Sequence, residues 1–315
     1  MASALNITDR AKILIGTDDQ VTNAELLSIT QTRLEMMYDA WIWSRTVREF
    51  TISLIANISS TSSDEVTVTN GDATVTSAGT PFTTSPSMVG YQIQIGAEPH
   101  YFFIDSVTST SVIELGDGEG NAVTWPRATA SGSSWRIFQH RYALPSDCND
   151  VLVLSHDKGD LEEVDGGRVE IDFVDPDRSS THDPPKRWWY DGESTGNVRG
   201  IAVWGNPAAA RLLRGWYARI APALSSGTNI DVPLAPLVYG VAADTLSMLF
   251  AKTGAEQYAR GSSHFNTIAK SSLRDAVLKD RNRWSPPTTF GKRSRTPLAR
   301  DHSFFPQLMT MGDPF

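Results

Sequence analysis

The chain has 315 residues and 40% hydrophobic content, which is enough for a sizeable core and for more than one module. Its formal net charge is −8, yet residues 281–315 hold six Lys or Arg against two Asp, so the rest of the chain carries about −12. This acidic body argues against tight nucleic-acid binding, because neutralising phosphates needs clustered cations. Cys148 is the only cysteine, which excludes an intrachain disulfide.

The apolar patterning suggests no membrane partner. No apolar run approaches the roughly 18 residues of a membrane span, and the amino terminus lacks the pattern of a secretory signal. We therefore expect a protein that is made and used in a cytoplasm.

The first fifty residues have a helical pattern. Thr8 or Asp9 can cap a short helix that ends at Gly16, and a longer helix should run from Asn23 to Trp41. Residues 50–58 are enriched in β-branched side chains and predict a strand.

Residues 64–140 predict an inserted all-β module. Valines alternate with threonines on both sides of Asn70-Gly71, which is a strong hairpin signal. Further short strands are expected at 91–95, 101–104, 111–115 and 135–138, each bounded by turn residues. Five or six strands in about 75 residues predict a small barrel or sandwich.

The chain then returns to the main module. We expect a strand at 151–154, a loop-rich stretch after it, and two paired strands at 198–204 and 212–220 that are joined through Asn206-Pro207.

Residues 236–279 predict a helical hairpin. Apolar residues recur at helical spacing from Val238 to Phe250 and again from Phe265 to Val277. Pro236 fits a first helical turn, and Lys252-Thr253-Gly254 supplies the stop between the helices.

Residues 284–315 predict an extended carboxyl-terminal arm. Pro286, Pro287, Pro297 and Pro306 prevent a continuous helix. The large rings follow no helical or strand pattern that would bury them within the segment, which implies a partner surface. We expect the arm to bind the portal or a neighbouring copy through nine residues: Trp284, Phe290, Lys292, Arg293, Arg295, Phe304, Phe305, Leu308 and Phe315.

The sequence predicts no catalytic, metal or cofactor site. The six histidines lack metal-site spacing. Glu162-Glu163 and Asp175-Pro-Asp177 are paired carboxylates of the type that glycosidases use, but we favour surface roles for them. The aromatic residues Trp188, Trp189, Tyr190, Trp204 and Trp216 could stack on sugars or bases, and we favour core and subunit contacts instead.

Four motifs, taken in order, resemble a known family. They are the amino-terminal helices ending in Trp41-Ile-Trp43, the β motifs at 66–76 and 88–95, the return motif from Tyr142 to Asp147, and the closing hairpin from Pro233 through Ala259 and Phe265. This order resembles the head-to-tail adaptor (connector) proteins of tailed double-stranded DNA bacteriophages, and the likeness covers most of the chain.

The resemblance implies a structural virion protein and not an enzyme. Such adaptors form a ring, usually of twelve copies, below the portal; they extend the DNA channel used in ejection and present a docking surface for the tail. The implied partners are further copies of the chain, the portal protein and a tail or neck protein, with double-stranded DNA passing through without specific binding. The implied location is the neck of the virion, after assembly in the host cytoplasm.

We therefore expect an α+β fold with three parts. Residues 1–63 and 141–283 should form a helical bundle with a small antiparallel sheet, 64–140 the inserted all-β barrel or sandwich, and 284–315 the arm. Two alternatives remain open. One is a tail terminator or other tail-associated protein whose β module binds a surface glycan, and the other is a glycan-degrading enzyme using Asp175 or Asp177.

Overall fold

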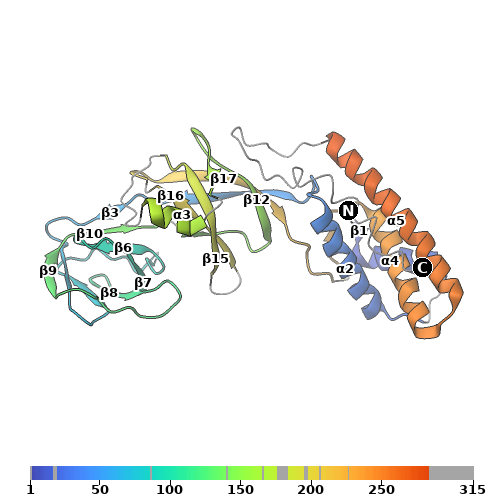
Figure 1. Ribbon diagram of the computed structural model, residues 1–315, viewed down its shortest axis with the longest axis horizontal. Helices are drawn as coiled ribbons and strands as arrows, with labels where there is room; N and C mark the ends of the chain where they lie inside the picture. The colour runs from blue at the N-terminus through green and yellow to red at the C-terminus, as the bar shows by residue number, and fades with distance from the viewer. Residues whose placement is uncertain are drawn as a thin grey trace. The chain divides into compact units, whose positions relative to one another are not determined.

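The computed structural model describes residues 2–16, 20–85, 87–139, 141–164, 167–175, 184–194, 198–205, 207–225 and 227–283. The predicted arm therefore lies outside the described residues, as does Asp177. Within the described ranges the fold is mixed α+β, with five helices and several antiparallel sheets (Figure 1). The α+β class is confirmed, whereas the bundle and barrel arrangements stay predictions.

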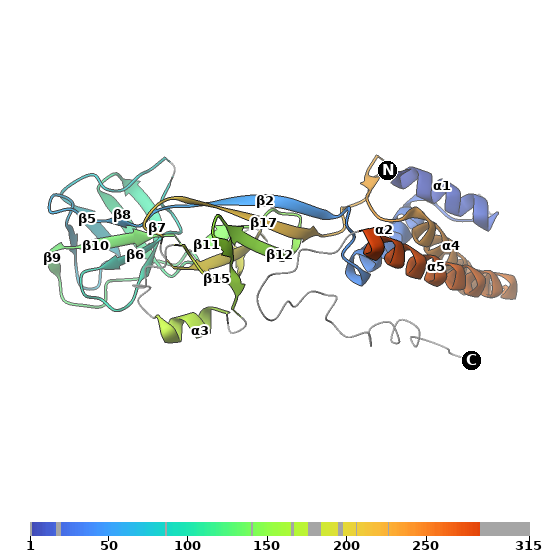
Figure 2. The same cartoon turned by 90° about the horizontal axis from the view of Figure 1, so that it is seen from above.

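Four of the helices pack together. They are α1 (Ala4–Ile15), α2 (Asn23–Ala40), α4 (Leu234–Thr253) and α5 (Glu256–Arg283). Helix α4 contacts the other three, and their apolar faces share one core (Figure 2). The expected start of α1 at Thr8 or Asp9 is wrong, because the helix begins at Ala4, and both Ala4 and Ile7 are fully buried in this core.

The helix ends follow ordinary capping rules. Thr22 caps α2: its hydroxyl accepts a hydrogen bond from the Glu25 amide, while the Glu25 carboxylate accepts one from the Thr22 amide. Gly254 ends α4 in a left-handed conformation with φ of 69°, as the predicted hairpin stop requires. The two long helices are thus joined by a very short turn.

The all-β part forms an eight-stranded sheet in the order β3-β10-β6-β7-β8-β5-β4-β9. Its strands are β3 (Ile58–Ser59), β4 (Val66–Val68), β5 (Thr74–Ser77), β6 (Gln92–Ile95), β7 (Phe102–Ser109), β8 (Val112–Gly116), β9 (Ala130–Ser133) and β10 (Trp135–Phe138). The Asn70-Gly71 hairpin is confirmed, since β4 and β5 pair antiparallel with Val68 opposite Val75, and Gly71 has φ of 78°. The sequence did not predict β9, which is short and half exposed.

Two four-stranded sheets contain the remaining long strands. One has the order β11-β16-β15-β14, built from β11 (Arg141–Ala143), β14 (Glu162–Glu163), β15 (Arg187–Ser194) and β16 (Val198–Trp204), with α3 (Gly167–Val174) packed on β15. The other has the order β13-β12-β17-β2, built from β2 (Val47–Leu54), β12 (Cys148–His156), β13 (Gly159–Asp160) and β17 (Arg211–Arg219). A two-stranded sheet pairs β1 (Ala2–Ser3) with β18 (Asn229–Ile230).

This topology corrects the expected pairing of 198–204 with 212–220. Both segments are strands, but β16 pairs with β11 and β15, while β17 lies between β12 and β2 in the other sheet. The 155–197 stretch expected to be loop-rich also contains α3, β14 and β15. Alternation identified the strands correctly, whereas their partners depend on segments far away in sequence.

The chain divides into two compact units, and each is built from separate stretches of sequence. One unit comprises 1–49, 147–153 and 216–315, and the other comprises 50–146 and 154–215. The first contains the four packed helices and the second contains the eight-stranded sheet and α3. The boundaries expected at 64, 141 and 284 remain a prediction.

Helix α4 is long and apolar enough to cross a membrane by length and composition alone. The sequence-based statement that no run approaches such a span therefore needs correcting. More than half of the apolar window is buried in the structure, at 56%, and it contacts α1, α2 and α5. Its apolar character is thus used for helix packing, as in the core helix of many folds.

Candidate functional site

The connection between α2 and β2 is held by buried hydrogen bonds. Trp43 is 2% exposed, and its indole Nε1 donates to the carbonyl of Met37 at 2.9 Å, within the last turn of α2. Both the amide and the hydroxyl of Thr46 donate to the Trp43 carbonyl, each at 2.9 Å. These bonds satisfy backbone groups at the helix end and fix the angle at which β2 begins.

The same connection binds the last turn of α5. The Asp280 carboxylate accepts three hydrogen bonds: from the Trp41 indole at 3.0 Å, from the Ser44 amide at 3.0 Å and from the Ser44 hydroxyl at 2.5 Å. Helix α5 ends at Arg283, so the predicted arm begins one turn after this attachment. Asp280 therefore fixes the place from which the chain continues into residues 284–315.

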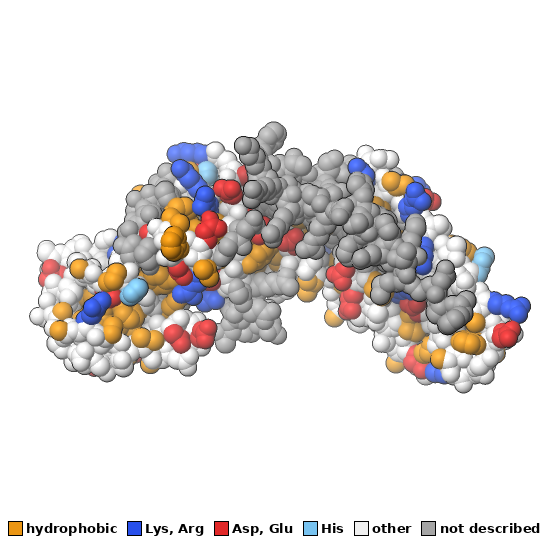
Figure 3. Space-filling model, in the orientation of Figure 1, with side chains coloured by type: hydrophobic (Ala, Val, Ile, Leu, Met, Phe, Trp, Pro, Cys, Tyr) orange, Lys and Arg blue, Asp and Glu red, His pale blue; other side chains and the backbone are white. Residues whose placement is uncertain are grey.

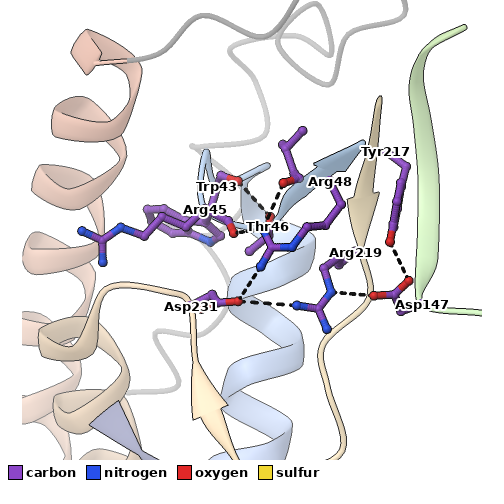
Figure 4. Close-up of polar contacts among 9 residues, drawn as sticks. Trp43, Arg45, Thr46, Arg48, Asp147, Tyr217, Arg219 and Asp231 are labelled. Atoms are coloured by element: carbon purple, nitrogen blue, oxygen red, sulfur yellow. Dashed lines mark hydrogen bonds and ion pairs between the residues drawn. The ribbon is translucent and has the colours of Figure 1, made fainter. Parts of the chain in front are cut away.

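A line of alternating charges runs from Arg48, near the start of β2, to Asp147 (Figure 4). Arg48 donates from Nη2 to Asp231 at 3.1 Å, and Arg219 contacts the same Asp231 oxygen at 3.5 Å. Arg219 also donates from Nε to Asp147 at 2.7 Å, and the Tyr217 hydroxyl donates to the other Asp147 oxygen at 2.8 Å. Two carboxylates and two guanidinium groups thus join β2, β17, β12 and the segment after β18.

Eight residues of the attachment and of the line of charges form what we call the polar junction: Trp41, Ser44, Arg48, Asp147, Tyr217, Arg219, Asp231 and Asp280. All of them belong to the helical unit.

Burial and, to a smaller extent, nearby carboxylates raise the pKa values of two tyrosines, one in the polar junction and one near it. Burial, followed by the hydrogen bond and negative charge of Asp147, raises the pKa of Tyr217 to about 12. Burial and the charge of Asp231 raise the pKa of Tyr38 as well. Both phenols therefore stay protonated at neutral pH, and Tyr217 acts as a hydrogen-bond donor.

A shallow depression of about 360 Å³ adjoins the junction. It is lined by Glu35, Tyr38, Asp39, Asn149, Ile220 and Ala221. Its rim is acidic, and the residues that the structure describes contain no group of three or more His, Cys, Asp or Glu able to hold a metal ion.

The polar junction is suited to holding secondary-structure elements in place. Asp280 attaches the end of α5 to the α2–β2 connection. Arg48 on β2 and Arg219 on β17 are linked through Asp231, which follows β18, and Arg219 also binds Asp147, which precedes β12. Networks of this kind hold elements in a fixed arrangement, because breaking one pair leaves a partly buried charge without its partner.

Each described carboxylate of the alternative enzymatic hypothesis has its own contacts. Asp175 is 3% exposed at the end of α3 and accepts a hydrogen bond from the Trp204 indole at 2.9 Å. Glu162 and Glu163 are exposed on β14, and Glu162 lies 3.6 Å from Arg187. Asp177, like the arm residues, lies outside the described residues.

Two of the five aromatic residues are core residues, two are half-buried and one is exposed. Trp188 and Trp189 are 3% and 1% exposed, and Trp188 makes an edge contact with Tyr190 at 5.2 Å between ring centroids. Trp204 stacks under the Arg187 guanidinium at 5.6 Å. Trp216 is 42% exposed.

The sequence analysis did not identify the polar junction as a site. Two of its members nevertheless lie in motifs that carried the family resemblance, since Trp41 begins the Trp-Ile-Trp motif and Asp147 ends the return motif. The others had no usable signal, because single charged residues on strands are common.

The polar junction links residues that are far apart in the sequence, which is a structural role. Comparison with protein families gives a more specific result: residues 108–291 match the family described as SU10 adaptor protein. This match covers more than half of the chain, and the protein therefore belongs to the SU10 adaptor protein family. A comparison with curated proteins gave no match.

Family membership indicates a phage adaptor role. It makes the protein a structural component of the virion that associates with other virion proteins. The matched region runs from within β7 to beyond α5, so it includes Asp147, Tyr217, Arg219, Asp231 and Asp280 of the polar junction.

Proposed function

We propose that the protein is a head-to-tail adaptor of a tailed bacteriophage. Twelve copies form a ring below the portal, extend the DNA channel and present a docking surface for a tail or neck protein. The observation that carries this proposal is the family match over 108–291, which includes both helices of the α4–α5 hairpin.

The proposed contact with the portal or a neighbouring copy is made by the arm, residues 284–315. The polar junction supports this, because Asp280 holds the last turn of α5 by three hydrogen bonds and gives the arm a fixed starting point. A segment that is attached to its protein at one end binds a nearby partner at high effective concentration, and a ring repeats the contact in every copy.

The charge distribution supports a DNA conduit. The chain before residue 281 carries about −12, so its surface repels a passing duplex, and the proposed role needs neither catalysis nor a cofactor. Specific DNA binding would instead require clustered cations.

The test compares the full chain with a version that ends after Arg283, using purified portal rings in a pull-down and by cryo-electron microscopy. The full chain should add a ring to the portal, and the truncated chain should stay soluble and fail to dock. Docking of the truncated chain at the level of the full chain would exclude the arm, and density only at the distal tail would exclude the adaptor role.

A matched pair of variants tests whether docking needs the basic side chains of the arm and not only the presence of the segment. Lys292, Arg293 and Arg295 are changed together to alanine in one variant. The control changes three exposed basic residues of α5 to alanine, namely Lys270, Arg274 and Lys279. Only the arm variant should lose portal docking.

A further inference from the structure

Helix α3 has one buried and one exposed apolar face. Ile171 is fully buried and packs in a small core with Val164, Trp189 and Ala202. On the outer surface, Val169 is 79% exposed, Phe173 is 89% exposed and Val174 is 58% exposed. Val169 and Phe173 are four residues apart and therefore lie on the same side of the helix. Figure 3 shows hydrophobic side chains gathered on the surface over α3.

Charged pairs frame this apolar face. Arg168 lies 3.2 Å from Asp172 along the helix, and Arg187 on β15 lies 3.6 Å from Glu170. A ring and two branched side chains exposed together within eight residues, with a polar rim, have the composition of an interaction site. We refer to Val169, Phe173 and Val174 as the α3 patch.

The remaining parts of the chain narrow down what can cover the α3 patch. The segments beside α3 that lie outside the described residues are 165–166 and 176–183, and Pro176 is their only apolar residue. The other short gaps are polar or small, apart from Met1 and Pro86. Large apolar side chains outside the described residues are otherwise confined to 284–315, which holds Trp284, Phe290, Phe304, Phe305, Leu308 and Phe315.

We propose that the α3 patch is the docking site for residues 284–315 of a neighbouring copy of this protein. The inference rests on the proposed ring, which places copies side by side. A segment of 32 residues spans at most about 110 Å when extended, which allows a contact outside its own copy.

The charges around the α3 patch also favour residues 284–315 as the segment that covers it. Strand β14 and helix α3 together carry four acidic residues, Glu162, Glu163, Glu170 and Asp172. They face two cations, Arg168 on α3 and Arg187 on β15, which lies 3.6 Å from both Glu162 and Glu170, so the surround keeps an excess of negative charge. The arm carries Lys292, Arg293, Arg295 and Arg300 against two aspartates. The aromatic rings of the arm fill the apolar face while its cations meet the acidic surround.

Photo-cross-linking in the full chain tests this contact. Phe173 is replaced by the photoreactive residue benzoylphenylalanine, which its 89% exposure allows, and ¹⁴N-labelled and ¹⁵N-labelled copies are mixed before illumination. Mass spectrometry should find position 173 joined to peptides from 284–315 in mixed-isotope pairs. Cross-links only to other segments, only to the same copy, or none at all would overturn the proposal.

A second measurement tests the same contact from the other side, with the photoreactive residue in the arm. Benzoylphenylalanine at Phe305 should cross-link to α3 peptides, and combining it with Val169→Ser and Phe173→Ser should reduce that yield at least about tenfold, as expected for losing one buried ring and one branched side chain. The matched control is Ile13→Ser with Met36→Ser, whose side chains are 79% and 56% exposed on other helices. An equal reduction in the control would also count against the α3 patch.

The two proposals fail differently. If the full chain forms a ring on the portal while position 173 does not cross-link to the arm, only this inference is lost. If the cross-link forms and no ring docks on the portal, the arm joins copies of the chain and the portal role is lost.

Discussion

The amide and the hydroxyl of Ser44 both donate hydrogen bonds to the carboxylate of Asp280, although the two residues are 236 positions apart in sequence. An aspartate in the last turn of a helix faces the negative end of the helix dipole, which is an unfavourable position. The bonds from Ser44 and from the Trp41 indole offset this cost, so the carboxylate at this position serves the attachment and not the helix.

We expect Asp280→Ala to lower the free energy of unfolding by about 1–3 kcal/mol, because it removes three hydrogen bonds to a charged group. Urea denaturation followed by helical circular dichroism measures the change. The control is Asp275→Ala, an exposed aspartate on the same helix, which should change stability by no more than about 0.5 kcal/mol. Equal stability of the two variants would show that the attachment contributes nothing.

Arg219→Ala should be more damaging than other arginine changes in β17. It leaves Asp147 and Asp231 without a shared cation, and we expect a loss of about 2–3 kcal/mol. Arg214→Ala in the same strand removes an exposed arginine and should cost about 0.5 kcal/mol or less. Unfolding in urea measures both variants, and a similar loss in both would contradict a special role for Arg219.

The raised pKa of Tyr217 predicts that the folded protein loses stability at alkaline pH. Its pKa is raised to about 12 in the folded protein, so between pH 10 and 12 the unfolded chain loses the phenolic proton while the folded chain keeps it. Stability from this group is therefore complete below about pH 10 and falls as the pH rises. We expect Tyr217→Phe to be less stable than the wild type by about 1–2 kcal/mol at pH 8, with a difference that shrinks towards pH 12.

Thermal unfolding of both proteins at several pH values from 8 to 11 measures this difference. A gap between wild type and variant that stays constant over the whole range would mean that Tyr217 titrates normally.

Gly215→Ala should destabilise the sheet unit. A methyl group at this position would collide with the ring of Phe50, which is 9% exposed and cannot easily move away. We expect a loss of about 1–3 kcal/mol, as for other overpacked sites. Gly227→Ala is the control, because a methyl group there meets nothing within 4 Å. Chemical denaturation compares the two, and an unchanged midpoint for Gly215→Ala would show that Phe50 repacks freely.

Local signals in the sequence were sufficient for much of the fold. The α4–α5 hairpin follows from apolar spacing and from Gly254, because glycine has no Cβ and adopts the left-handed conformation at little cost. The β4–β5 hairpin follows from Asn70-Gly71 in the same way. These signals act over a few residues, so they can be read without knowing the rest of the structure.

Long-range pairing could not be predicted. The alternating pattern of β17 indicates a strand, but it does not say that β2 and β12 are its neighbours. The polar junction has the same difficulty, since Arg48 and Asp231 are 183 residues apart. Nothing near either residue in sequence distinguishes them from ordinary surface charges.

The helical unit is assembled from the two ends of the chain, and this has a consequence during synthesis. Helices α1 and α2 leave the ribosome first, yet Leu237, Val241 and Leu249 of their shared core belong to α4, about 190 residues later. At about 5–20 residues per second, that interval lasts roughly 10–40 s. The first two helices must therefore wait with their apolar faces uncovered while the entire sheet unit is translated and has time to fold.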